Sequence, residues 1–159
     1  MDWAIWYLQR RFGDVQHLTT DTASKSIDEF VVVDARRSDE FDVSHIPNAQ
    51  RLHFRATDCE LQSFVDAQLS SSGRQIVCYC SVGWRSALLV RRLNAMIRAK
   101  NCPEGGGEVK VYNMAGSIFK WANEGRPLVD GRGNSTQTVH PFNSIFSFML
   151  DADKRQWPD

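Results

Sequence analysis

The feature that most constrains the fold of this chain is an alternation between short β-branched runs and longer stretches of helical periodicity. Four runs are predicted to be strands, at residues 30–33, 49–54, 75–79 and 109–112. Apolar side chains at helical spacing predict helices at residues 57–70 and 86–99. Because strands that alternate with helices need crossover connections, we expect an α/β fold with a central, mostly parallel β-sheet flanked by helices on both faces.

Length and composition indicate one globular domain with terminal extensions. The 159 residues are 42% hydrophobic and 24% charged, which is ordinary for a folded domain and argues against disorder. The turn-rich breakers at residues 70–73 and 104–107 are too short to separate two domains. We therefore divide the chain into an N-terminal helical extension (1–14), a main domain (15–130) and a C-terminal extension that packs on it (131–159).

The charge pattern favours neither nucleic acid nor an anionic membrane as a partner. Nineteen basic residues balance nineteen acidic ones, and no block of like charge occurs. No apolar stretch approaches the roughly 20 residues that cross a bilayer, and the first residues lack a basic segment before an apolar core. We therefore expect a cytoplasmic protein. A mitochondrial presequence is the alternative, against which Asp2 and the shortage of serine argue.

The first residues are rich in aromatic side chains and are predicted to form a short helix. It spans residues 3–12, has cations near its C-terminus and stops at Gly13. Trp3, Trp6 and Tyr7 have two interpretations. They are either an additional part of the core, which we favour, or a contact with a second copy of the chain in a homodimer.

The four cysteines are too few for a disulfide scaffold and lack the paired spacing of a zinc site. No phosphate-binding glycine motif occurs either, so the sequence implies neither a metal nor an organic cofactor. Cys78 precedes Cys80 by two positions on a predicted strand, and we interpret it as a small buried side chain rather than a resolving thiol. Cys59 and Cys102 are interpreted as surface thiols.

Cys80 stands where a buried strand is predicted to end and a helix to begin. Unpaired backbone N–H groups and the helix dipole create positive potential at such a position, which lowers the pKa of a thiol. Gly83 lets the backbone turn sharply, and Arg85 offers a planar fork to an oxygenated anion. Ser86 is expected to cap the helix. The loop thus suits a covalent intermediate with negative charge, and the alternative is a buried structural cysteine beside a turn.

Several motifs extend this pattern beyond the loop, and together they resemble a known family. The motifs lie at residues 33–36, 40–41, 44–49, 79–86 and 111–121. In order and spacing they closely resemble a single-domain rhodanese (thiosulfate sulfurtransferase) homology domain, over roughly residues 15–130. Several motifs in register are far more specific than the loop by itself.

The resemblance implies a rhodanese-like fold and a ping-pong sulfur transfer. Cys80 would be the catalytic residue, taking the outer sulfur of thiosulfate or a similar donor and releasing sulfite. The sulfur would then pass from a Cys80 persulfide to cyanide or a thiol. Arg85 would steer the donor anion. The substrate-binding loop would comprise Ser81, Val82, Gly83, Trp84, Arg85 and Ser86.

Two alternatives come from the same superfamily. Related phosphatases and arsenate reductases carry one more residue between the cysteine and the arginine, whereas the loop from Cys80 to Arg85 has the six residues of the sulfurtransferases. The resemblance therefore places phosphatase or arsenate reductase chemistry behind sulfur transfer. A non-catalytic binding or regulatory module of the same fold is the second alternative, which the presence of Cys80 disfavours.

Other positions are assigned to the scaffold rather than to the chemistry. Asp34 and Arg36 are expected to form ion pairs near the end of a strand, with Glu40 as a further partner for the guanidinium. His45 is expected to fix its loop by hydrogen bonds. Ser44 stands where the family usually has glycine, so a positive φ there would strain the backbone.

Trp84 and two stretches near the C-terminus are not assigned to the chemistry. Trp84 is either an aromatic wall of the active site, where it would narrow access, or an ordinary packing residue. Residues 139–142 resemble a C-terminal extension of some family members, and no chemistry is assigned to them. The apolar segment at residues 145–150 is expected to pack on the core.

Overall fold

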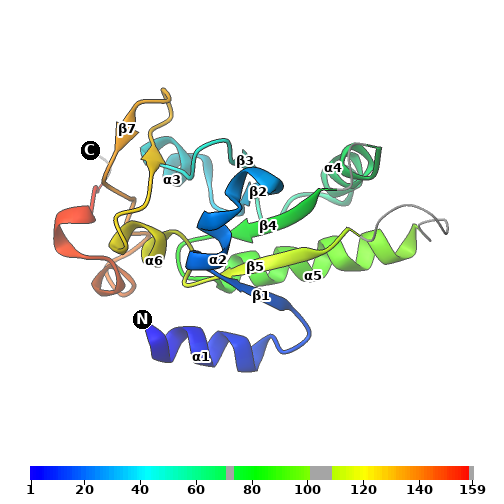
Figure 1. The fold of residues 1–159 in the computed structure, drawn as a ribbon, viewed down its shortest axis with the longest axis horizontal. Coiled ribbons are helices and arrows are strands. Elements are labelled where there is room, and N and C mark those ends of the chain that lie inside the picture. The colour runs from blue at the N-terminus through cyan, green and yellow to red at the C-terminus, as the bar shows by residue number, and fades with distance from the viewer. Residues whose placement is uncertain (71–73, 101–108, 158–159) are drawn as a thin grey trace.

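The computed structural model describes residues 1–70, 74–100 and 109–157, and it has an α/β fold around one five-stranded sheet (Figure 1). All four neighbouring strand pairs are parallel. The strand order is β1-β5-β4-β2-β3. The strands are β1 (Gln16–Thr19), β2 (Phe30–Asp34), β3 (Gln50–Arg51), β4 (Gln75–Tyr79) and β5 (Val111–Ala115).

The central strands match the predicted runs, and the outer ones differ from them. β4 coincides with its prediction, and β2 is longer by one residue, Asp34. The predicted strand at residues 49–54 is wrong in length, because only Gln50 and Arg51 pair with β2. β5 starts two residues later than predicted. β1 was missed because it is a short edge strand with a largely polar sequence, so no apolar run marks it.

Helices cover both faces of the sheet, as predicted. One face packs against α1 (Asp2–Arg11), α4 (Asp58–Ser70) and α5 (Trp84–Ala99). The other packs against α2 (Thr20–Lys25) and α6 (Ser117–Asn123). The alternation of side chains along a strand explains the division, since Val31 and Val33 of β2 join the first cluster and Val32 joins the second. The short helix α3 (Ser38–Val43) and the 3₁₀ turn η1 (Ile27–Glu29) flank β2 in the sequence.

The C-terminal segment contributes to the second face. It begins with the antiparallel pair β6 (Leu128–Val129) and β7 (Ser135–Thr136) and continues through the 3₁₀ turns η2 (Ser147–Met149) and η3 (Ala152–Lys154). Met149 and Leu150 are buried in the same cluster as α6. The side-chain amide of Asn123 in α6 donates to the carbonyl of Met149 at 3.0 Å. Figure 1 shows this orange-to-red segment beside α6.

The N-terminal helix docks through small and aliphatic side chains. Ala4 and Leu8 of α1 are buried, whereas Trp3, Trp6 and Tyr7 are 61%, 62% and 49% exposed. The interpretation of these three aromatic side chains as part of the core is therefore wrong. Their contact with a second copy of the chain stays a prediction.

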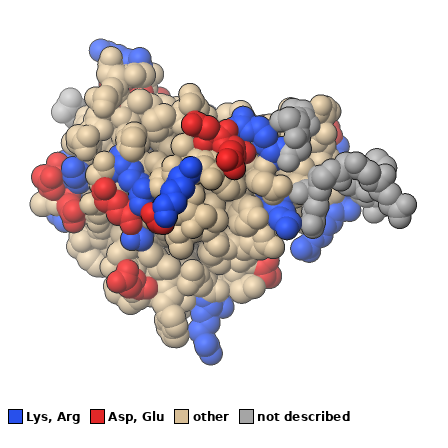
Figure 2. All heavy atoms as spheres, in the orientation of Figure 1, with Lys and Arg blue, Asp and Glu red and all other residues tan. Residues whose placement is uncertain are grey.

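The distribution of charge and the properties of the helices bear on possible partners. Acidic and basic side chains are interspersed on the face of the molecule that Figure 2 shows. Within the described residues, no helix combines the length and the apolar character that crossing a bilayer needs. The same part of the chain contains no group of three or more His, Cys, Asp or Glu side chains placed to hold a metal ion. The expectations about nucleic acid and membrane partners stay predictions.

Candidate active site

The cysteine that carries the predicted chemistry lies at the carboxyl end of the central strand of the sheet. Cys80 directly follows β4, and α5 begins four residues later at Trp84. Gly83 between them has φ 114°, a conformation that suits glycine because it has no Cβ. This turn brings the N–H of Gly83 to Cys80 Sγ, to which it donates a hydrogen bond of 3.1 Å. The loop therefore presents a backbone donor to the sulfur.

The surroundings of Cys80 stabilise its thiolate. The side chain is 1% exposed, and burial by itself raises the pKa of a thiol. The charge of Arg85 and hydrogen bonds from Ser86 and Gly83 outweigh this effect, so the pKa of Cys80 lies below its ordinary value. Burial raises the pKa of Cys78 far above its usual range. Cys80 is thus suited to be a nucleophile, and Cys78 is a small buried side chain, as predicted.

Of the two remaining cysteines, only Cys59 belongs to the described residues. Cys59 of α4 is exposed, in agreement with its interpretation as a surface thiol. Cys102 lies outside the described residues, as do the predicted breaker at 104–107 and most of the one at 70–73.

Asn113 of β5 braces the loop from the neighbouring strand. Its Oδ1 accepts a hydrogen bond of 2.6 Å from Ser86 Oγ, and its Nδ2 donates to the carbonyl of Gly83 at 3.0 Å. Asn113 thereby fixes both residues that hydrogen-bond to the sulfur of Cys80. The prediction that Ser86 caps the helix is wrong, because α5 starts at Trp84 with Gly83 as its N-cap. Ser86 therefore falls in the first turn of the helix, beside the sulfur.

A second turn, at the start of α6, supports the main chain of the loop. Ser117 Oγ accepts a hydrogen bond of 3.2 Å from the N–H of Cys80. The N–H groups of Ile118 and Phe119 donate to the carbonyls of Cys80 and Ser81, both at 3.1 Å. Ser117 itself has φ 51°, which is unusual for serine. The position of Cys80 is therefore set by three donor–acceptor pairs from one neighbouring turn.

Arg85 forms a bidentate ion pair with Glu40 of α3. Its Nη1 and Nη2 each lie 2.7 Å from one carboxylate oxygen of Glu40, and Nη2 also donates to Ser81 Oγ at 2.8 Å. Burial opposes ionisation of Glu40, but Arg85 holds the pKa of that carboxyl below its usual value. Glu40 therefore occupies the fork that was expected to receive a donor anion. The role of Arg85 in steering that anion stays a prediction.

The scaffold residues form a separate buried group. Arg36 pairs with Asp34, with Nη2 2.6 Å from Oδ2, and not with Glu40. The same Nη2 donates to the carbonyl of Ser44, whose φ of −170° is extended backbone, so serine causes no strain there. His45 donates from Nδ1 to a main-chain carbonyl at 3.0 Å, which supports its structural role.

A small pocket with a volume of about 120 Å³ is lined in part by Cys80. Trp84 forms one wall and also packs edge-on against Phe12, with 5.1 Å between the ring centroids. Its role in narrowing access to an active site stays a prediction. Two further aromatic side chains come from the C-terminal segment, to which no chemistry was assigned. The pocket is lined by Cys80, Ser81, Val82, Trp84, Arg85, Phe142 and Phe146.

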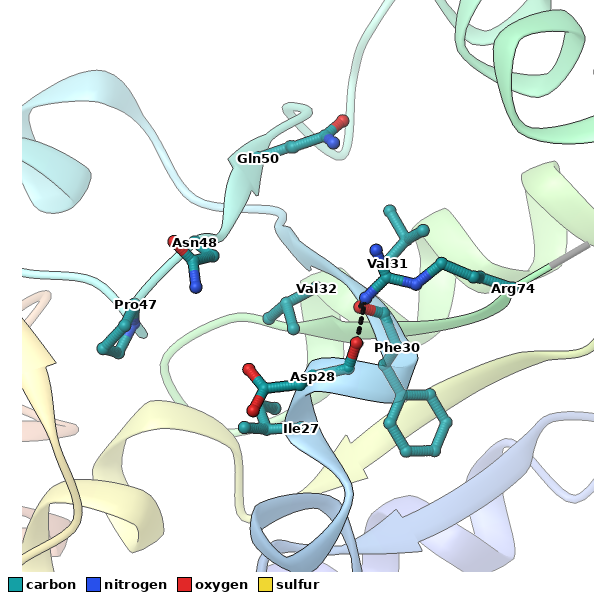
Figure 3. Close-up of a pocket in the computed structure, with 9 residues that line it drawn as sticks. All are labelled: Ile27, Asp28, Phe30, Val31, Val32, Pro47, Asn48, Gln50 and Arg74. Atoms are coloured by element: carbon teal, nitrogen blue, oxygen red, sulfur yellow. Dashed lines mark hydrogen bonds between the residues drawn. The ribbon is translucent and has the colours of Figure 1, made fainter. Parts of the chain in front are cut away.

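A wider pocket of about 280 Å³ shares no residue with the one at Cys80 (Figure 3). It lies between η1, the start of β2 and the chain just before β3. The guanidinium of Arg74 donates to the main-chain carbonyls of Asp28, Glu29 and Phe30. Among the described residues that line this pocket there is no cysteine, serine or histidine. We therefore place the candidate active site at Cys80.

Several residues of the site were not predicted as such. Glu40, Asn113 and Ser117 all belong to the motifs on which the resemblance rests, but their contacts with the loop cross 27 to 45 positions of the chain. No local pattern encodes such contacts. Phe142 belongs to a stretch that resembles an extension of some family members, and Phe146 to a segment expected to pack on the core, but nothing in the sequence placed either side chain at the pocket of Cys80.

Comparisons with known proteins agree with the motifs. A model of the rhodanese-like domain family matches residues 19–124 of the chain. No curated protein sequence matches it. Among solved structures, a rhodanese-related protein from Thermoplasma volcanium is 21% identical, with a TM-score of 0.54. That likeness covers 72% of this chain and 97% of the other.

Two further structures have similar scores. A thiosulfate sulfurtransferase from Pseudomonas aeruginosa is 18% identical with a TM-score of 0.55, over 91% of this chain and 25% of that protein. A protein of unknown function from Rhodopseudomonas palustris, described as a possible tyrosine phosphatase, is 21% identical with a TM-score of 0.55, over 77% of this chain and 92% of the other. At such identities the likeness shows the fold alone, and the predicted α/β architecture is confirmed.

Proposed function

Because this chain belongs to the rhodanese-like domain family, we propose that it is a sulfurtransferase that carries a sulfane sulfur on Cys80 between a donor and an acceptor. The observation that carries the proposal is the geometry at the sulfur. The N–H of Gly83 donates to Cys80 Sγ at 3.1 Å, and Cys80 lines a pocket. The lowered pKa of Cys80 supports a nucleophile, whereas an inert buried cysteine has a raised pKa, as Cys78 has.

The first half-reaction loads the protein with sulfur. The thiolate of Cys80 attacks the outer sulfur of a donor such as thiosulfate, and a new S–S bond forms. The S–S bond of the donor breaks, and its electron pair leaves with sulfite. The terminal sulfur of the resulting persulfide carries the negative charge that the thiolate had. Backbone N–H groups in the loop at residues 81–86 would stabilise that charge, so the same loop serves reactant and product.

The second half-reaction unloads the sulfur. A thiolate or cyanide attacks the terminal sulfur of the persulfide, the S–S bond to Cys80 breaks, and its electron pair returns to Cys80. The product is a new persulfide or thiocyanate. Neither half-reaction needs an external oxidant or reductant. Asn113 and Ser117 act as positioning residues, because they hold the loop without lining the pocket.

Intact-mass spectrometry tests the proposal. The folded protein is incubated with thiosulfate and, separately, with an organic hydropersulfide, and freed of excess donor. We expect the mass to increase by one sulfur atom with at least one donor, and thiocyanate to form when cyanide is added. Cys80→Ser removes the nucleophile and should abolish both results. Cys59→Ser is the matched control, because this exposed cysteine lies outside the pocket, and it should react like the parent protein.

Two results would contradict sulfur transfer through Cys80. One is a folded parent protein that no donor loads. The other is sulfur that remains bound in Cys80→Ser and disappears in Cys59→Ser. Turnover of an aryl phosphate or of arsenate by a protein that no donor loads would indicate the related phosphatase or reductase chemistry instead.

A further inference from the structure

The cation at the active site is already neutralised. Both Nη atoms of Arg85 bind the carboxylate of Glu40, and the Glu40 side chain is fully buried. Nη2 is in addition shared with Ser81 Oγ. A bidentate pair of this kind presents little net charge to a ligand. Moving Glu40 away to free the guanidinium would leave a buried carboxylate without its partner, which is strongly unfavourable.

An aromatic ring also covers one face of this guanidinium. Cζ of Arg85 lies 4.4 Å from the ring centroid of Phe142. Phe142 has φ 66°, an unusual backbone conformation for a bulky residue, and its N–H donates to Nδ1 of the buried His140 at 2.9 Å. A strained conformation persists only where the surroundings determine it, so the ring is held in place over Arg85. The guanidinium therefore offers neither its Nη edge nor this face to an incoming anion.

The rest of the pocket is mostly apolar. Val82, Trp84 and Phe146 line it together with Phe142. The hydroxyl of Ser81, which also lines it, is hydrogen-bonded within the pair of Arg85 and Glu40. Among the described lining residues, Arg85 is the one with a formal positive charge. The volume of about 120 Å³ is close to that of engineered apolar cavities of about 150 Å³ that bind benzene. The pocket thus suits one small apolar group beside the reacting sulfur.

Charge decides between two classes of sulfur donor. The loop amides at Cys80 stabilise one negative charge on sulfur. Thiosulfate is a dianion, so its sulfonate oxygens would enter an apolar pocket whose cation is paired with Glu40. Burial of a charge without a partner is costly. An uncharged donor avoids that cost and gains from burial of its apolar part.

Building on the proposed function, we infer that the preferred donor is an organic hydropersulfide that reacts in its uncharged form, R–S–S–H, and whose apolar group R is about the size of a benzene ring. Its outer sulfur meets Cys80, and its R group lies against Phe142, Phe146 and Trp84. The two phenylalanines of the C-terminal segment thereby determine the donor specificity.

The sulfur transfer balances without a further reactant. The Cys80 thiolate attacks the outer sulfur of R–S–S–H, forming a new S–S bond. The S–S bond of the donor breaks, and its electron pair leaves on the inner sulfur as R–S⁻. The proton of the transferred sulfur then moves to R–S⁻. The products are the Cys80 persulfide anion and the thiol R–S–H.

Donor loading of the full chain tests the inference. Second-order rate constants for loading are measured by quenched mass spectrometry with benzyl hydropersulfide, methyl hydropersulfide and thiosulfate. Each is divided by the rate constant of the same donor with free cysteine. For the parent protein we expect the benzyl donor to exceed thiosulfate by about tenfold or more, because a buried ring contributes favourably and a buried dianion does not.

Substitutions separate the pocket from the rest of the segment. Phe142→Ala and Phe146→Ala should each lower the benzyl-to-methyl ratio by about three- to tenfold, since each removes part of the ring's contact surface. Phe148→Ala is the control, because this 62% exposed side chain belongs to the same segment but does not line the pocket. It should leave the ratio unchanged.

The results distinguish failure of the donor inference from failure of the proposed sulfur transfer. Equal or faster normalised loading from thiosulfate, or an unchanged benzyl-to-methyl ratio in both folded phenylalanine variants, overturns the donor inference and leaves sulfur transfer intact. A folded parent protein that none of the three donors loads refutes the proposed function, and the inference falls with it.

Discussion

At the scale of single residues, the two cysteines around the end of β4 show how neighbours decide reactivity. Cys78 and Cys80 are both buried, and burial raises the pKa of each thiol. Only at Cys80 do the charge of Arg85 and hydrogen bonds from Ser86 and Gly83 reverse that effect. The thiolate at position 80 therefore depends on how the loop is held, and Asn113 holds it on two sides.

Removal of the Asn113 side-chain amide should weaken the thiolate. In Asn113→Leu, the carbonyl of Gly83 loses its donor and the loop is no longer held from β5, so we expect the N–H of Gly83 to move away from the sulfur and the pKa of Cys80 to rise toward its ordinary value. Alkylation of Cys80 by iodoacetamide near neutral pH should slow by about two- to tenfold, in line with the loss of one or two net hydrogen bonds. The measurement is the rate of alkylation as a function of pH, followed by peptide mass spectrometry.

The exposed Cys59 of the same chain serves as the internal control, and its alkylation rate should be the same in both proteins. The lowered pKa of Cys80 also makes the stability of the folded protein depend on pH. Ionisation of Cys80 stabilises the folded state above the unfolded-state pKa of about 8.5, and this contribution is lost as the pH falls through the lower pKa of the folded state. An unchanged alkylation profile for Cys80 in a folded Asn113→Leu protein would show that Asn113 does not position the loop.

At the scale of elements, the loop from Cys80 to Arg85 is held between the starts of two helices. Its own helix, α5, begins at the left-handed Gly83, and α6 begins after the left-handed Gly116. The first turn of α6 donates main-chain hydrogen bonds to the carbonyls of Cys80 and Ser81. Two tight turns on adjacent parallel strands, β4 and β5, therefore bring their helix starts together at one edge of the sheet.

A methyl group at Gly116 should disturb this arrangement. In Gly116→Ala the new Cβ would lie 2.6 Å from Lys120 Cβ, in addition to the strain of φ 78°. Gly125→Ala is the matched control, since φ there is 67° but nothing lies within 4 Å of the new atom. The left-handed strain of about 1–2 kcal/mol is common to both. Crowding should lower the free energy of unfolding of Gly116→Ala by about 1–3 kcal/mol more.

Urea unfolding of the two glycine variants measures this difference. Sulfur loading gives a second readout, because a shifted α6 start would move the carbonyls of Cys80 and Ser81, and only Gly116→Ala should load more slowly. Equal stability and equal loading of Gly116→Ala and Gly125→Ala would show that the α6 turn tolerates the added methyl group and does not constrain the loop.

At the scale of the whole molecule, the C-terminal segment is both part of the core and part of the pocket at Cys80. Leu150 is fully buried with α6 and β4 residues in the second cluster, while Phe142 and Phe146 line the pocket at Cys80. Packing of the segment and the shape of the pocket are therefore coupled. Loss of packing at one end of the segment should therefore lower the free energy of unfolding of the entire domain.

Truncation of Leu150 tests that coupling. Leu150→Ala removes a fully buried side chain and should lower the free energy of unfolding by about 2–5 kcal/mol. Ile145→Ala is the control, because Ile145 is 70% exposed, and its effect should stay within about 0.5 kcal/mol. Chemical denaturation followed by far-ultraviolet circular dichroism measures both. A Leu150→Ala protein with the stability of the parent would mean that the segment is not part of the cooperative unit.

The sequence by itself determined the elements whose signal is local. Continuous apolar runs gave β2 and β4, helical spacing gave α4 and α5, and the strand-to-glycine pattern gave the turn at Gly83. Together with the motifs, these fixed the α/β architecture and the candidate nucleophile Cys80. Each of these features depends on residues that are close together in the chain, so periodicity and turn chemistry suffice to read them.

Only the tertiary structure decided which side chains meet. Glu40 reaches Arg85 across 45 positions, and Asn113 reaches Ser86 across 27. Phe142 arrives at the same pocket from the C-terminal segment. The short edge strand β1 likewise exists because β5 offers it a hydrogen-bonding partner. Such contacts form when distant segments pack on a shared sheet, and no local pattern of residues specifies the partner that packing brings near.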